Sequence, residues 1–188
     1  AQGLDTTPAA GNNGSAQSDA AQIFTEGAQP WHAPEDFTIP LQAQKHLMNV
    51  EGYKANWRHG ISGGHELNGL FQYLESLPCP EGGSTIVPQV AHPTIAGIAN
   101  IDYRIPRQDK NGNLTGGYRY FSHPKTVFDS KLISEQQIYD WAMEAFTGTG
   151  ATISNQRKIV GTAKNGLKFV GYLDANDPTK IKTFYFTF

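Results

Sequence analysis

The chain has 188 residues, of which 38% are hydrophobic and 17% charged, with 20 glycines and 11 prolines. This composition is typical of a turn-rich globular protein and argues against a helical bundle. The formal net charge of −2 excludes a strong overall basic field, so a nucleic-acid ligand would need a local basic patch. Cys79 is the single cysteine, which excludes an internal disulfide and a thiolate metal cage.

The first part of the chain is predicted to be an arm. Residues 1–35 are rich in Ala, Gly, Gln, Asn and Ser, a composition that buries too little apolar surface to form a core. We therefore predict a linker or flexible arm over residues 1–38 and one folded domain over residues 39–188. No apolar run is long enough to span a bilayer, and the first residues lack the pattern of a signal peptide. The Ala1 start suggests a fragment of a longer protein or a processed chain.

Residues 46–65 contain three of the six histidines and lie between two predicted helices. Pro40 suits the start of the first helix, which should end before Gly52. The second helix is predicted to begin near His65 and to stop at Pro78. Because a helix N-terminus disfavours a charged imidazole, a neutral His65 that can accept a proton is expected. The apolar stripe of the second helix comprises Leu67, Leu70, Phe71, Leu74 and Leu77.

The middle of the chain predicts strands and then a third helix. A short strand is possible over residues 84–90, and apolar and polar residues alternate over residues 101–105. A glycine- and asparagine-rich turn then leads to a returning strand over residues 118–121. Ser134 and Gln137 have the spacing of a capping box, which predicts a helix that ends at the next group of glycines.

The last forty residues predict an antiparallel meander. Strands over residues 158–163 and 167–173 are joined by the hairpin signal Asn165-Gly166, and a final strand covers residues 181–188. Side chains alternate across a strand, so one set should face the core and the other the opposite side. The core set is Phe184, Phe186 and Phe188, and the opposite set is Ile181, Thr183, Tyr185 and Thr187. The two hydroxyls of Thr183 and Tyr185 form either a substrate platform or an ordinary polar face.

Four motifs follow one another in the chain: His46-Leu47-Met48 with Val50-Glu51-Gly52, then Gly63-Gly64-His65, then Lys125 before a helix, then Thr183-x-Tyr185. Together they resemble the EndoU family of uridylate-preferring endoribonucleases. More narrowly, residues 46–188 look like the toxin domains at the C-termini of bacterial contact-dependent growth inhibition effectors. The resemblance implies an α+β fold of the barnase/EndoU/RelE type, with N-terminal helices followed by an antiparallel sheet and an inserted helix. Two alternatives stay open, because His59 could replace His46 and Lys131 could replace Lys125.

The resemblance also implies a chemistry. RNA would be cleaved near uridine through its own 2′-hydroxyl, giving a 2′,3′-cyclic phosphate, with no cofactor or metal required and manganese stimulation left open. This reaction needs a base, an acid and a cation at the crowded phosphate. We expect His65 to be the base, His46 the acid and Lys125 the cation. Thr183 would bond the uracil edge, and Tyr185 would stack on or orient the nucleotide.

Substrate binding is assigned to Arg104, Arg119, Thr126 and Gly64. A local basic patch, or else an ordinary solvated face, is expected from Arg104, Arg107, Lys110, Arg119 and Lys125. The resemblance further implies tRNA or another structured RNA as substrate, a larger carrier protein N-terminal to this chain, and a cognate immunity protein. It implies a monomer that is secreted as part of a cell-surface effector and acts in the cytoplasm of the target bacterium.

Two other functions are compatible with the sequence. A zinc-dependent hydrolase could use His46, His59, His65 and Glu66 as ligands, although HExxH-type spacing is absent. A non-enzymatic β domain rich in Tyr and Phe could instead bind carbohydrate or protein. Three tests distinguish these alternatives from a ribonuclease. They ask whether the protein cleaves RNA, whether His65→Ala abolishes the cleavage, and whether a chelator does.

Overall fold

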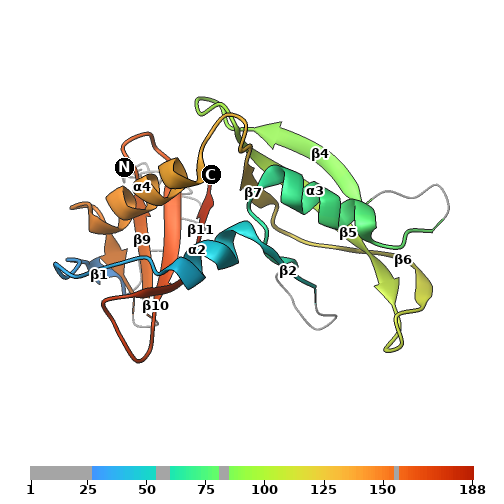
Figure 1. Ribbon diagram of the computed structural model, residues 1–188, viewed down its shortest axis with the longest axis horizontal. Coiled ribbons are helices and arrows are strands. Elements are labelled where there is room, and N and C mark those ends of the chain that lie inside the picture. The colour runs from blue at the N-terminus through green and yellow to red at the C-terminus, as the bar shows by residue number, and fades with distance from the viewer. Residues whose placement is uncertain (1–26, 54–59, 81–84, 155–156) are drawn as a thin grey trace, which may run out of the picture.

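The computed structural model describes residues 27–53, 60–80, 85–154 and 157–188. They form two lobes, each with a β-sheet, helical cover and its own apolar core (Figure 1). Chain order does not follow the lobes, because the segments before and after the second lobe both belong to the first. Within the described residues, no helix has the length and apolar character needed to cross a membrane.

The first lobe is built on a five-stranded antiparallel sheet. Helix α4 (Glu135–Thr147) covers one face of this sheet, and α2 (Leu41–Met48) packs beside β11. The core between them is rich in phenylalanine, as Phe146, Phe169 and Phe184 are all fully buried. In spatial order, the strands are β1 (Gln29–Pro30), β8 (Thr152–Ile153), β9 (Lys158–Thr162), β10 (Lys168–Leu173) and β11 (Ile181–Thr187).

The second lobe is organised around one long strand, β5 (Ile98–Gln108). On one edge β5 pairs with β4 (Ile86–Ala91), and on the other with β6 (Leu114–Tyr120) and β7 (Lys125–Phe128). Helix α3 (Leu67–Ser76) covers the apolar face of β5 through Leu70 and Leu74. A small ladder of β2 (Val50–Gly52) and β3 (Ser62–Gly63) joins α2 to this lobe.

The α+β prediction is confirmed, and so are the helices predicted before and after the histidine-rich stretch. The capping box of α4 is also confirmed, because the Ser134 hydroxyl accepts from Gln137 N and the Gln137 side chain accepts from Ser134 N, both at 3.1 Å. The sequence did not reveal β7, β1, β8 or the β2–β3 ladder. These strands have two to four residues, so long-range pairing rather than local pattern creates them.

Two expectations for the last strand were wrong. Ile181 was placed with Thr183 and Tyr185, but it is in the core, because the register shifts by one residue opposite Tyr172 and Leu173 and flips the side-chain alternation. Phe188 was placed in the core, but it is 40% exposed, since the strand ends at Thr187. Its ring contacts the His92 ring instead, at a centroid distance of 4.6 Å.

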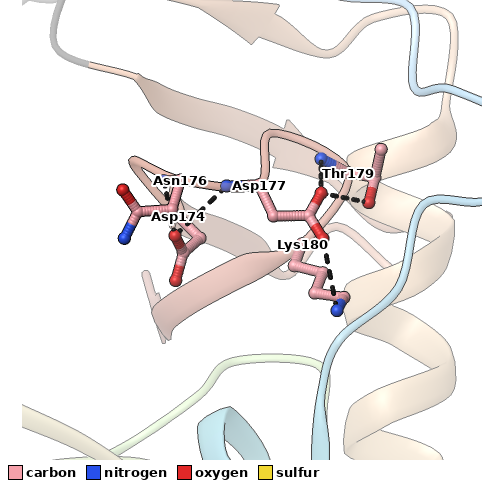
Figure 2. Close-up of polar contacts among 5 residues, drawn as sticks. All are labelled: Asp174, Asn176, Asp177, Thr179 and Lys180. Carbon is pink, nitrogen blue, oxygen red and sulfur yellow. Dashed lines mark hydrogen bonds and ion pairs between the residues drawn. The ribbon is translucent and has the colours of Figure 1, made fainter.

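The described part of the predicted arm packs against the first lobe. Strand β1 pairs with β8, and Phe37 is in the core. The next residue, Thr38, contacts the loop between β10 and β11, because its N donates to Thr179 O at 2.9 Å. Figure 2 shows how this loop is fixed by Asp177, which accepts from the Thr179 N and Oγ1 and pairs with Lys180. The predicted boundary at residue 38 thus lies inside a packed segment, and residues 1–26 lie outside the described residues.

Candidate active site

His65 lies where the two lobes meet. Its backbone N donates to Leu47 O of α2, and its carbonyl accepts from Phe128 N of β7, both at 2.9 Å. Its ring is parallel to the Tyr185 ring of β11, with 6.5 Å between centroids and 12° between planes. One residue therefore contacts α2, β7 and β11, and its position is fixed by backbone hydrogen bonds.

Two glycines allow this approach. Gly63 and Gly64 have φ angles of +67° and +68°, in the left-handed region that favours glycine. A Cβ at Gly63 would collide with the carbonyl oxygens of His46 and Asn49, and a Cβ at Gly64 with the Val50 side chain. The Gly-Gly pair therefore brings the His65 segment against the end of α2, which carries His46.

The surroundings of His65 set its tautomer and its charge. Nδ1 lies 2.7 Å from Thr126 O. A carbonyl oxygen only accepts, so Nδ1 carries the proton and Nε2 presents a lone pair. Burial first, and then the charge of Lys125, hold the pKa of His65 well below its usual value of 6.5. The neutral state expected from the sequence is thus supported, but through burial and cationic neighbours, since His65 precedes Glu66, the N-cap of α3.

His46 has a different environment on the last turn of α2. Its Nδ1 lies 2.5 Å from Glu51 Oε1, and Ser62 Oγ donates to the other carboxylate oxygen at 3.2 Å. An ionised carboxylate only accepts, so Nδ1 donates and Nε2 remains for proton exchange. Glu51 is a functional candidate that the sequence reasoning missed. The available signal was an acidic residue just after the helix that carries His46.

Lys125, the expected cation, is the first residue of β7. Its Nζ donates to Ile61 O at 3.1 Å, and burial lowers its pKa to about 8. Lys125 therefore remains mostly protonated near pH 7, and its charge acts on His65. The alternative, Lys131, is exposed in the turn before α4, where its backbone N donates to Asp129 Oδ1. The electrostatic link to His65 favours Lys125 over Lys131.

Thr183 and Tyr185 share the face of β11 opposite the buried phenylalanines, as the alternation predicted. Tyr185 is half-buried beside His65, and burial raises the pKa of its hydroxyl, which stays protonated. Thr183 pairs across the sheet with Tyr172 of β10, so Tyr172 shares this face. Tyr172 is a further aromatic candidate that the sequence reasoning did not single out.

A family model described as bacterial EndoU nuclease matches residues 40–186. The chain belongs to this family. The expectation of an EndoU-type endoribonuclease is thereby confirmed. The residues expected to act in catalysis, His46, His65, Lys125, Thr183 and Tyr185, all lie within the matched residues.

Two proteins named tRNA nuclease CdiA are similar to this EndoU chain. The protein from Yersinia mollaretii is 25% identical over 166 residues, which are 88% of this chain and 5% of that protein. The protein from Escherichia coli (strain STEC_O31) is 26% identical over 146 residues, which are 75% of this chain and 4% of that protein. The EndoU chain therefore spans about a twentieth of the length of these relatives.

The structure separates two members of the predicted basic patch, Arg104 and Arg119. Arg104 pairs with Tyr120 and Arg119 with Ile105, which are neighbours of opposite orientation on the hairpin. Arg119 therefore shares the face of the buried Ile105, where its Nη1 donates to the Tyr53 hydroxyl at 2.9 Å. Arg104 lies on the opposite face, so one flat patch cannot contain both arginines.

Two other predicted binding residues are occupied by structural contacts. Thr126 is 4% exposed, and its hydroxyl donates to Asn100 Oδ1 at 2.6 Å while its carbonyl holds the His65 ring. Gly64 is buried, and its N donates to Asn49 O at 2.9 Å. Both residues position His65, and substrate contact by either one stays a prediction.

The described residues among the possible zinc ligands make hydrogen bonds within the protein. Glu66 caps α3 by accepting from Gly69 N at 2.7 Å, and it also accepts from Ser130 Oγ. His59, the proposed alternative to His46, lies outside the described residues. Among the residues that the structure describes, no three His, Cys, Asp or Glu side chains gather in a group that could hold a metal ion.

Proposed function

We propose that this EndoU domain cleaves RNA by transphosphorylation, with His65 as base, His46 as acid and Lys125 as cation. The observation that carries the proposal is the contrast between the two histidines at one junction. His65 is kept neutral beside a lysine, whereas the His46 ring is hydrogen-bonded to the Glu51 carboxylate. Two titratable groups held in contrasting surroundings are the usual arrangement for acid–base catalysis.

The proposed reaction needs no water in its first step. His65 Nε2 takes the proton of the ribose 2′-hydroxyl, and the 2′-oxygen attacks the adjacent phosphorus. The bond from phosphorus to the 5′-oxygen breaks, and that oxygen takes a proton from His46 Nε2. The products are a 2′,3′-cyclic phosphate and a 5′-hydroxyl. Lys125 Nζ stabilises the extra negative charge on the phosphoryl oxygens, and partial burial strengthens this effect.

The face of β11 suits the nucleotide next to the cleaved bond. Tyr185 lies parallel to the His65 ring and keeps its hydroxyl proton, so it can stack on or orient the nucleotide. Thr183 lies two residues away on the same face, where its hydroxyl can donate to or accept from the uracil edge. A uridine preference follows from this proposal.

The biological setting is proposed from the relatives. Both are named tRNA nucleases, which supports a tRNA or another structured RNA as the substrate. Both are far longer than this chain, which supports a larger carrier protein on whose surface the domain is exported. The domain would then act as a toxin in the cytoplasm of a competing bacterium. A cognate immunity protein would protect the producing cell by covering the junction of His46 and His65.

The decisive experiment is incubation of the protein with total bacterial RNA in EDTA, followed by mapping of the new ends. We expect cyclic phosphate ends after uridine, concentrated in one or a few RNAs, and no cleavage when the uridine at the cut site is replaced by deoxyuridine. Activity that disappears in EDTA and returns with zinc would instead support a metal-dependent hydrolase. Complete absence of RNA cleavage would favour a binding domain. Added manganese tests stimulation.

A further inference from the structure

The β5–β6 hairpin carries arginines and tyrosines in contact at its surface. The Arg104 Cζ lies 3.9 Å from the centroid of the Tyr118 ring, and its Nη1 donates to the Tyr120 hydroxyl at 3.1 Å. Arg107 Nε donates to the Tyr118 carbonyl at 3.2 Å. Tyr120 is 65% exposed, a large value for an aromatic residue. The hairpin therefore displays the Arg104 guanidinium beside an exposed ring, and the exposed Arg107 is bonded to the backbone of β6.

This cluster shares a sheet face with the support of His65. Asn100 and Arg104 are four residues apart on β5, so they lie on one face and are separated by about 13 Å. Asn100 pairs with Thr126 of β7, and its side chain accepts a hydrogen bond from the Thr126 hydroxyl on that face. The carbonyl of the same Thr126 accepts from the His65 ring. The Arg104 cluster therefore extends away from the catalytic junction along the same strand, and Figure 1 shows the hairpin projecting from the second lobe.

We propose that Arg104, Arg107, Tyr118 and Tyr120 form a docking surface for the RNA that flanks the cleaved nucleotide. The inference rests on the proposed ribonuclease function. The exposed Tyr120 ring stacks on an unpaired base, and the guanidinium groups of Arg104 and Arg107 pair with phosphates. Arg104 already lies on the Tyr118 ring, so less side-chain entropy is lost when it binds a phosphate.

The charges along the hairpin indicate where the phosphates lie. Asp102 is exposed between Asn100 and Arg104 on the same face, and its carboxylate repels a phosphate. The turn beyond β5 adds Lys110, which is exposed. The neighbouring Asp109 carboxylate accepts from Asn113 N and Nδ2 inside that turn, at 3.0 Å each. Phosphate contacts are therefore placed from Arg104 outward to the tip, in a chain whose net charge is −2.

The test measures binding separately from cleavage. A fluorescent 2′-O-methyl RNA oligonucleotide, which lacks the attacking hydroxyl, is titrated with wild-type protein and variants. We expect Tyr120→Ala to raise Kd by about 5- to 100-fold and Tyr120→Phe by less than about 3-fold, because the ring provides the stacking. Arg104→Gln should raise Kd and reduce the slope of log Kd against log salt by about one. Lys164→Gln removes an exposed charge on the other lobe and should leave Kd unchanged.

Cleavage of a uridine-containing dinucleotide gives the second readout, because so short a substrate cannot span from the junction to the hairpin. Tyr120→Ala should reduce kcat/KM for long RNA by at least about 5-fold more than for the dinucleotide. An unchanged Kd for Tyr120→Ala and Arg104→Gln overturns the docking surface, whether or not RNA is cleaved. The cluster would then be a candidate contact for a protein partner. RNA binding that depends on Tyr120 in a protein that cleaves nothing upholds the surface and defeats the proposed ribonuclease function.

Discussion

The two histidines occupy contrasting parts of the molecule. His65 is held on three sides by α2, β7 and β11, beside a buried lysine, and its pKa is low. His46 lies in the last turn of α2, its side chain is 28% exposed, and it is bonded to a carboxylate that is itself 46% exposed. The two imidazoles therefore have contrasting surroundings, because a lysine charge acts on His65 and a carboxylate bonds His46. The proposed roles of base and acid rest on these surroundings, because the residue type is the same at both positions.

The strongest test of this contrast uses two substrates. His65→Ala should lower cleavage of uridine-containing RNA by about 10²- to 10⁴-fold, the usual contribution of a general base. His46→Ala should do the same for RNA, but much less for a uridine 3′-nitrophenyl phosphate ester, whose leaving group needs no proton. Stopped-flow or absorbance assays measure both. His32→Ala, at an exposed histidine, is the matched control. Equal losses for both variants on the ester would show that the two roles are not divided in this way.

Lys125→Met tests the proposed cation, whose charge acts on His65. Removal of a charge from the phosphate should reduce kcat by about 100-fold. The free energy of unfolding near pH 7 should stay the same or rise, because burial disfavours the charged form of Lys125 and methionine lacks this penalty. Enzyme assays and urea denaturation measure the two effects. Lys131→Met should change neither, and a Lys125→Met protein that loses stability in step with activity would assign this lysine a structural role.

Glu51→Gln should weaken the contact between His46 and its carboxylate partner. The amide keeps the shape and can still accept the Nδ1 proton, but it no longer compensates a positive imidazole. We expect a fall in kcat of about 10-fold on RNA and little change on the nitrophenyl ester. If Glu51→Gln lowers kcat equally on both substrates, the Glu51 carboxylate does not assist His46 as the acid. Glu75→Gln, on the exposed face of α3, is the control.

The smallest effect concerns stability at mildly acidic pH. The folded-state pKa of His65 lies below the unfolded value of 6.5, so the unfolded chain binds the proton first as pH falls. The neutral ring therefore contributes stability above pH 6.5 that is lost below it, by about 1 kcal/mol for each pH unit. Urea titrations between pH 7 and 5 should show this loss in the wild type and a smaller one in His65→Gln. Identical pH slopes would contradict a depressed pKa.

Much of the fold was accessible from local patterns. Helices α2, α3 and α4 have apolar residues at helical spacing, and the Ser134 capping box depends only on neighbouring residues. The meander of β9, β10 and β11 followed from alternation and the Asn165-Gly166 turn. The register shift near Lys182 did not, because a single extra residue in one strand is specified by its partner strand.

The candidate site shows the same division. The order of the motifs and their resemblance to the EndoU family pointed to His46, Gly63-Gly64, His65, Lys125 and the Thr183-x-Tyr185 strand as candidates. Only the tertiary structure revealed that Glu51 bonds His46 and that Thr126 holds His65 from a strand 61 residues away in sequence. It also separated Arg104 from Arg119, since a strand's neighbours and covering helix decide which face is buried. Proton preferences depend on charge and burial in three dimensions, and no spacing along the chain encodes them.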